Sequence, residues 1–301
     1  MSITTATHLP AYGDDLRVVV PAPGNGAGNW AGAASAVLVD GTFWLTWRVR
    51  RPLAEGRGVT VVVARSVDGE TFEPVAEIDR ELFGAESFER PVLVPVPDLG
   101  WRLYLSCATP GSKHWWVDSL TAPTPADLPA GHQQIVLPGD EHVAVKDPVV
   151  TRDADGWHLW LCCHPLDEPG HEDRMTTRYL TSDDGLAWTD RGEVLAGRPG
   201  EWDARGARVT TVVGHDPLTV LYDGRPDAMS NWFETTGVAV WDAGEGHGRL
   251  VPDTSVAPIR SPYADGAFRY AAAVPLGDGR TRYYVEAARD DGAHDLVTMV
   301  R

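Results

Sequence analysis

The chain has 301 residues, 43% of them hydrophobic, and a formal net charge of −17 at pH 7. That length and hydrophobic content suffice for one all-β domain with a large core. The acidic balance disfavours nucleic acids and anionic membranes as partners, because both are polyanions. No stretch approaches the roughly 20 apolar residues of a membrane helix, and the N-terminus lacks the regions of a signal peptide. The sequence therefore predicts a cytoplasmic protein without a nucleic-acid or membrane partner.

A repeated unit runs along the chain, and helical periodicity is nearly absent. Each unit of about 55 residues has a small or charged opening, an apolar strand, a polar turn and an aromatic-rich strand. The copies open at Ala33, Arg90, Asp147, Ala207 and Arg269. Five copies predict a single all-β domain over 1–301, a five-bladed β-propeller with up to four antiparallel strands per blade. The blades are expected at about 30–80, 86–137, 143–196, 200–255 and 262–301 plus 16–21.

Two details of the repeat predict how the blades pack and close. The first and third units continue into similar turns, SVDGETF from Ser66 and SDDGLAW from Ser182. Their Asp-Gly pairs suit tight hairpins, and the aromatic residue of each turn can pack between blades. The last unit ends after about three strands, so we expect the segment LRVVVP, from Leu16, to supply the missing outer strand and to close the ring.

The third opening carries a family resemblance. The segment DPVVTRDADGWHLWL, from Asp147, resembles the blade start of glycoside hydrolase family 43, and the whole layout is similar to the group that includes families 32, 68 and 130. The resemblance implies an active site at the narrow mouth of the channel, where first strands begin and loops between second and third strands converge. Family 43 has its aspartate base at the first opening. That position is Ala33 here, so the standard assignment fails.

Carboxylates occur instead at three later openings, and these are the catalytic candidates. Asp147 aligns with the family's Asp-Pro pair beside Lys146, whose charge favours ionisation, as base or orienting group; a turn-capping role is the alternative. Glu89 is its second-blade counterpart, and a surface ion pair is the alternative. Glu201 or Asp203, at the fourth opening, is the candidate proton donor, or both are loop residues. Glycoside hydrolysis commonly needs one carboxyl group as acid and a second as base or nucleophile.

Charged and aromatic residues at the openings and facing loops are candidates for substrate binding. The only two lysines, Lys113 and Lys146, both map to the predicted mouth. With the nearby arginines they predict a cationic funnel suited to a carboxylate, phosphate or sulfate, unless the arginines pair with neighbouring acids. The full set is Trp30, Arg48, Arg90, Lys113, His114, Trp115, Lys146, Arg205, Arg208, Asp223, Arg225, Asn231, Glu234, Arg269 and Tyr270.

The sequence thus predicts a glycosidase that cleaves a terminal bond of a small glycoside or oligosaccharide, anionic if the funnel is real. A phosphate-dependent phosphorylase of the same fold is one alternative, favoured by Ala33 and by the funnel. A noncatalytic sugar-binding propeller is another. No cofactor is expected. The loop with His164, His171, Glu172 and Asp173 fits no zinc spacing, so no metal is expected and the loop is interpreted as a cover over the site.

Overall fold

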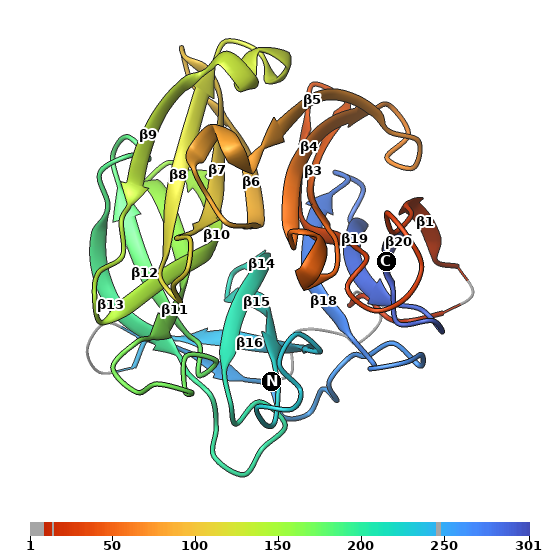
Figure 1. Ribbon diagram of the computed structural model, residues 1–301, viewed down its shortest axis with the longest axis vertical. Helices are drawn as coiled ribbons and strands as arrows, with labels where there is room; N and C mark the ends of the chain where they lie inside the picture. The colour runs from red at the N-terminus through yellow and green to blue at the C-terminus, as the bar shows by residue number, and fades with distance from the viewer. Residues whose placement is uncertain (1–8, 14, 245–247) are drawn as a thin grey trace.

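The computed structural model describes residues 9–13, 15–244 and 248–301. These residues form a five-bladed β-propeller, with groups of antiparallel strands arranged around a common centre (Figure 1). The fold predicted from the repeat is confirmed. Residues 1–8, on which part of the signal-peptide argument rests, lie outside the described residues. Within the described part of the chain, no helix is long and apolar enough to cross a membrane.

The blades follow one another in chain order, and the innermost strand of each comes first. Blade 1 holds β2 (Trp30–Val39), β3 (Thr42–Arg50), β4 (Gly58–Ser66) and β5 (Glu73–Asp79). Blade 2 holds β6 (Phe88–Val96), β7 (Gly100–Ala108), β8 (Trp115–Ala122) and β9 (His132–Leu137). Blade 3 holds β10 (Val143–Asp153), β11 (Gly156–Pro165), β12 (Thr176–Ser182) and β13 (Thr189–Leu195). Blade 4 holds β14 (Ala207–His215), β15 (Leu218–Gly224), β16 (Thr235–Asp242) and β17 (Arg249–Pro252).

Blade 5 joins the two ends of the chain. Its strands β18 (Phe268–Pro275), β19 (Thr281–Ala288) and β20 (His294–Val300) are completed by β1 (Arg17–Val20), which pairs antiparallel with β20 (Figure 1). The predicted closure by an N-terminal strand is confirmed. A parallel pairing of Trp30 with His294 also links blade 5 to blade 1. Short 3-10 helices lie at Leu53–Glu55, Arg80–Phe83 and Pro125–Ala130.

The two Asp-Gly turns have the structural role that the sequence predicts. In each turn one carboxylate oxygen, from Asp68 or from Asp184, accepts two backbone N–H bonds within the turn. The aromatic residues then reach the neighbouring blade. Phe72 contacts Tyr284 of blade 5 with ring centroids 5.8 Å apart, and Trp188 contacts Tyr104 of blade 2 at 6.5 Å. These contacts extend the apolar clusters between blades, which provide most of the core.

A bulge near the start of every first strand positions the site. The register shifts within β2, β6, β10, β14 and β18. Three bulge residues have positive φ: Ala33 at 52°, Asp147 at 50° and Tyr270 at 53°. A bulge re-aims a side chain, and a non-glycine residue adopts positive φ only where its surroundings hold it there. Several strands begin a few residues before the predicted openings, so these residues lie inside strands.

Candidate active site at the channel mouth

Glu89 and Asp147 converge on one hydroxyl group at the centre of the propeller. The Tyr270 hydroxyl lies 3.2 Å from Oε1 of Glu89 and 3.2 Å from Oδ2 of Asp147. Since a phenol has a single proton to donate, it serves one carboxylate at a time, while Nη1 of Arg208 donates to its oxygen at 2.8 Å. Blades 2, 3 and 5 thus bring two carboxylates to the same tyrosine hydroxyl, each at 3.2 Å.

Asp147 is completely buried and held as an anion. Its Oδ2 accepts a bond from Arg208 at 2.9 Å, and its Oδ1 accepts the Arg90 backbone N–H at 3.3 Å. Burial alone would raise the pKa of this carboxyl, but the charges of Lys146 and Arg208 lower it to about 2. Asp147 is therefore ionised at neutral pH. Its inaccessibility favours the orienting role over that of a base that touches substrate.

A buried network of alternating arginines and carboxylates surrounds this pair. Arg208 also donates to Asp223 at 2.8 Å. Arg269 bridges Glu234 at 2.6 Å and Glu286 at 2.7 Å. Two further ion pairs belong to this network, Arg48 with Glu89 and Arg225 with Glu234.

This network differs from the predicted open funnel. Five of the six arginines that the sequence assigned to the funnel have a carboxylate partner, as the cost of burying a charge requires. The sixth, Arg90, is buried without one among the residues that the structure describes. Burial alone would raise the pKa of Glu234, but Arg269 and Arg225 hold it well below its usual range.

Glu286 fills the place left empty by Ala33. The Ala33 N–H donates to Oε2 of Glu286 at 3.0 Å, and a Cβ on Gly32 would lie only 2.0 Å from the same oxygen. A carboxylate from blade 5 therefore stands beside the first opening. Despite complete burial, Arg269 and the hydrogen bond from His294 keep the pKa of Glu286 well below its usual range. Sequence reasoning missed this residue, although a lone acid in the apolar strand β19 was a signal.

A cavity of about 560 Å³ is lined by Arg57 and Lys146, two basic residues that also contact Glu89. We call it the mouth pocket; its lining includes Arg57, Lys113, Trp115, Lys146, His164, Glu172, Asp173, Asn231 and Trp232. Oε2 of Glu89 lies 3.7 Å from Nη2 of Arg57 and 4.0 Å from Nζ of Lys146. The Glu89 side chain keeps 7% of its surface exposed, whereas that of Asp147 keeps none. Glu89 is thus the carboxylate of the pair that borders the pocket wall.

Lys146 is a largely buried cation of this wall. Burial lowers its pKa to about 8, against the opposing effect of Asp147. His164 is held neutral, because burial and the charge of Lys146 lower its pKa well below its usual value. Arg57, in contrast, keeps an exposed part of its side chain in the pocket. Two basic groups of this wall therefore lie next to Glu89, the largely buried ammonium of Lys146 and the partly exposed guanidinium of Arg57.

Three tryptophans near the site differ in exposure: Trp115 and Trp30 are buried, and Trp232 is half-buried. Trp115 is 6% exposed and lies under two cations, with Nζ of Lys146 4.8 Å and the Arg57 guanidinium 5.1 Å from its centroid. Trp30 is buried against His294, with centroids 4.4 Å apart. Neither offers a free face for a sugar. Trp232, half-buried in the same pocket, is the more open ring, and sequence reasoning did not select it.

The remaining predicted binding residues lie at different distances from the pocket. Lys113 and Asn231 line it, so both lysines of the chain face the mouth. His114 borders a shallower depression beside it, and Arg205 pairs with Asp173 at 2.8 Å. Arg90 is a correction, because its side chain lines a separate cavity in the other half of the channel.

The structure does not bring Glu201 and Asp203 to the Glu89–Asp147 centre. Asp203 is buried and accepts bonds from Arg198 at 2.9 Å and from the Tyr222 hydroxyl at 2.8 Å. Glu201 is exposed in the turn before β14. These residues precede the strand that would have carried them into the channel, and Asp203 fastens that turn to β15. We therefore assign the proton donor to neither.

Two further pocket residues escaped sequence reasoning. Arg57 follows β3 in an irregular loop with positive φ, and no repeat aligned it with the mouth. His164 lies near the end of β11, and sequence reasoning considered it as a metal ligand or as part of a loop that covers the site. The signal that was available was position: Arg57 lies in the loop between the second and third strands of blade 1, and His164 lies where the second strand of blade 3 ends, at the same end of the channel.

Comparisons with known proteins agree with the fold. No protein-family model and no curated protein sequence matches the chain. Among solved structures, a thermostable family-43 glycoside hydrolase matches with a TM-score of 0.67 at 14% identity, over 94% of this chain and 91% of that one. A glycosyl hydrolase from Bacteroides ovatus matches at 0.64 and 13%, over 96% and 92%. A β-1,2-mannobiose phosphorylase from Listeria innocua matches at 0.61 and 14%, over 97% and 92%.

The structural neighbours are therefore glycoside hydrolases and phosphorylases of the family-43 and family-130 type, matched over nearly their whole length. At such low identity this similarity defines the propeller fold of the chain.

Proposed function

We propose that the protein is a glycosidase that cleaves a terminal glycosidic bond of a small glycoside bound in the mouth pocket. The observation that carries the proposal is the position of Glu89. It is a carboxylate next to a pocket wall, its Oε2 is 4.0 Å from the Lys146 ammonium, and the ionised Asp147 stands behind it across one tyrosine hydroxyl. The neighbours' glycosidase and glycoside phosphorylase fold supports an enzymatic role.

In this mechanism Glu89 is the nucleophile and Lys146 the proton donor. Their separation of 4.0 Å is too short for an inverting enzyme, whose two groups stand about 6.5–9.5 Å apart with a water between them. A Glu89 oxygen forms a bond to the anomeric carbon, the bond from that carbon to the departing oxygen breaks, and Lys146 gives the departing oxygen its proton. In the second step the neutral Lys146 takes a proton from a water, the water oxygen bonds to the anomeric carbon, and the bond to Glu89 breaks, which restores both groups. Because there are two displacements, the product retains the configuration at the anomeric carbon.

Lys146 suits this task because a general acid works best with a pKa near the working pH, and burial lowers its pKa to about 8. Asp147 cannot supply the proton, since its pKa of about 2 leaves it ionised. Its negative charge instead stabilises the protonated lysine, whose Nζ lies 3.8 Å from its Oδ2. Asp147 and Tyr270 are thus positioning residues.

In the described part of the chain, the mouth pocket is lined by three acidic residues, Glu86, Glu172 and Asp173, and by three basic ones, Arg57, Lys113 and Lys146. The basic residues support a second candidate function. Arg57, Lys113 and Lys146 could hold inorganic phosphate, which would attack the anomeric carbon in place of water. Arginine and lysine side chains are the usual protein partners of phosphate. The product would then be a sugar 1-phosphate.

The test is a screen of the purified protein against chromogenic furanosides and pyranosides, uronides included, each with and without inorganic phosphate. Release without phosphate supports the glycosidase. Strictly phosphate-dependent release establishes the phosphorylase instead. Saturable binding of a glycoside without any turnover would overturn both enzymatic proposals in favour of a noncatalytic sugar-binding propeller.

A further inference from the structure

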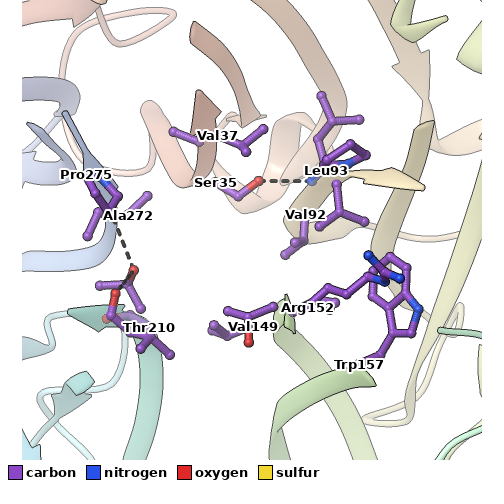
Figure 2. Close-up of a pocket in the computed structure, with 18 of the residues that line it drawn as sticks. Ser35, Val37, Val92, Leu93, Val149, Arg152, Trp157, Thr210, Ala272 and Pro275 are labelled. Carbon is purple, nitrogen blue, oxygen red and sulfur yellow. Dashed lines mark hydrogen bonds between the residues drawn. The ribbon is translucent and has the colours of Figure 1, made fainter. Parts of the chain in front are cut away.

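A second cavity occupies the other half of the channel. Its volume is about 530 Å³, in the usual range of small-molecule sites. We call it the far cavity; Val37, Val92, Val149, Thr210 and Ala272 line it, one from each first strand, together with Arg90. Figure 2 shows the first five around a common space, with Trp157 and Arg152 at one side. Val37, Val92, Val149 and Ala272 follow the bulges of their strands, and Thr210 lies within that of β14. The far cavity shares no described lining residue with the mouth pocket and is separate from it.

Arg90 forms the boundary between the two halves. Its side chain is 2% exposed, and Nη2 reaches across the channel to the Ala271 carbonyl at 3.4 Å. Its Nε and Nη1 are buried without a hydrogen-bond partner among the described residues. A buried guanidinium with unused donors is costly. Burial lowers the pKa of Arg90 to about 10, so it remains a cation at neutral pH.

The charge of the far cavity is opposite to that of the whole protein. The described residues that line it include three basic side chains, Arg90, Arg152 and His215, and no carboxylate. The chain as a whole has 43 acidic residues against 26 lysines and arginines. Valine, proline and alanine side chains supply most of the remaining wall. Such a wall cannot satisfy the many hydroxyl groups of a sugar, whereas it removes an apolar ligand body from water.

We propose that the far cavity binds a small organic carboxylate with an apolar body. The positive charges of Arg90 and Arg152 in the cavity wall attract the carboxylate, and the hydrocarbon part packs against the valine wall. Coulombic attraction in a partly buried site provides specificity for the anion, and burial of the hydrocarbon provides affinity. This site does not rest on the proposed glycosidase activity, because it shares no lining residue with the mouth pocket.

Isothermal titration calorimetry with three probes tests the proposal on the full chain. Octanoate has both charge and apolar body, octanol lacks the charge, and acetate lacks the body. We expect octanoate to bind with saturation, octanol at least tenfold more weakly, and acetate without measurable heat. Arg90→Met should weaken octanoate at least tenfold, whereas Arg17→Gln, an exposed arginine on β1, should leave its affinity unchanged.

A second variant covers the case in which Arg90→Met does not fold. Val37 lines the cavity outside the apolar clusters between blades, so Val37→Trp fills the space and should abolish octanoate binding. The proposal is overturned if octanoate does not bind at millimolar concentration. It is also overturned if octanol binds as tightly as octanoate, or if octanoate still binds Val37→Trp with unchanged affinity.

Discussion

The two halves of the channel are built from the same five strands and differ completely in chemistry. On the mouth side of the bulges, arginines and carboxylates alternate around Tyr270, and nearly every charge has a partner. On the far side, the same strands present valine, threonine and alanine beside Arg90 and Arg152, and no carboxylate is among the described residues that line this cavity. The comparison shows that a one-residue bulge in each first strand allows the same five strands to carry a polar site at one end of the channel and an apolar site at the other. The predictions below test that division.

Breaking the charge network should have the largest effect on stability. Arg208 bridges Asp147 and Asp223 in complete burial, so Arg208→Met leaves two carboxylates without their cation and should cost about 3–5 kcal/mol. Urea unfolding measures the loss. The matched control is Arg178→Met. It breaks the exposed ion pair of Arg178 with Asp190, which has a similar length, and should cost less than about 1 kcal/mol. Equal losses in the two variants would contradict the account.

Removing the proposed proton donor, Lys146, should have the largest effect on the catalytic rate. Lys146→Met should lower kcat at least 100-fold on the glycoside found by screening, the lower end for general acid catalysis. The wild-type kcat should fall as pH rises above about 8, where Lys146 loses its proton. Lys113→Met alters the same pocket away from Glu89 and should raise KM with little change in kcat. A flat rate between pH 7 and 9.5 would refute the role of Lys146.

Acid should weaken the mouth half selectively. The folded-state pKa of Asp147 is lowered to about 2 from an ordinary 3.8, so its contribution is complete above pH 4 and is lost as pH falls toward 2. At about 1.4 kcal/mol per pKa unit this is about 2 kcal/mol. The lowered pKa values of Glu234 and Glu286 act in the same direction, and the pKa of Asp223, which burial raises, acts against them. Urea midpoints at pH 6, 4 and 3 measure the decline, and equal midpoints at pH 6 and 3 would contradict it.

The far half should respond only to lost packing. Val149→Ala removes two buried methyl groups and should cost about 1–2 kcal/mol, with the same pH dependence as the wild type. A midpoint that changes more steeply with acid than in the wild type would show that the two halves are not independent.

The blades could be predicted from the sequence because each repeat carries its own strand pattern and turn chemistry. Glu89, Asp147 and Lys146 were found for the same reason, since they stand at the openings of the repeat. Glu286 and Arg57 were not, because they reach the centre from second strands and loops that the repeat does not align. Arg90 and its neighbour Glu89 lie toward opposite ends of the channel because of the bulge in β6, and this bulge could not be predicted from the repeat. Positive φ at Asp147 and Tyr270 leaves no sequence signal of the kind that glycine provides.

The central claim is that a glycosidic bond is broken beside Glu89. The most direct measurement is the rate of product formation by Glu89→Gln and Glu201→Gln against the wild type, on one glycoside and with melting temperatures recorded for all three. The account predicts at least a 100-fold loss of kcat for Glu89→Gln, and wild-type activity for Glu201→Gln, because Glu201 is exposed outside the pocket. Full activity in a folded Glu89→Gln protein would contradict it.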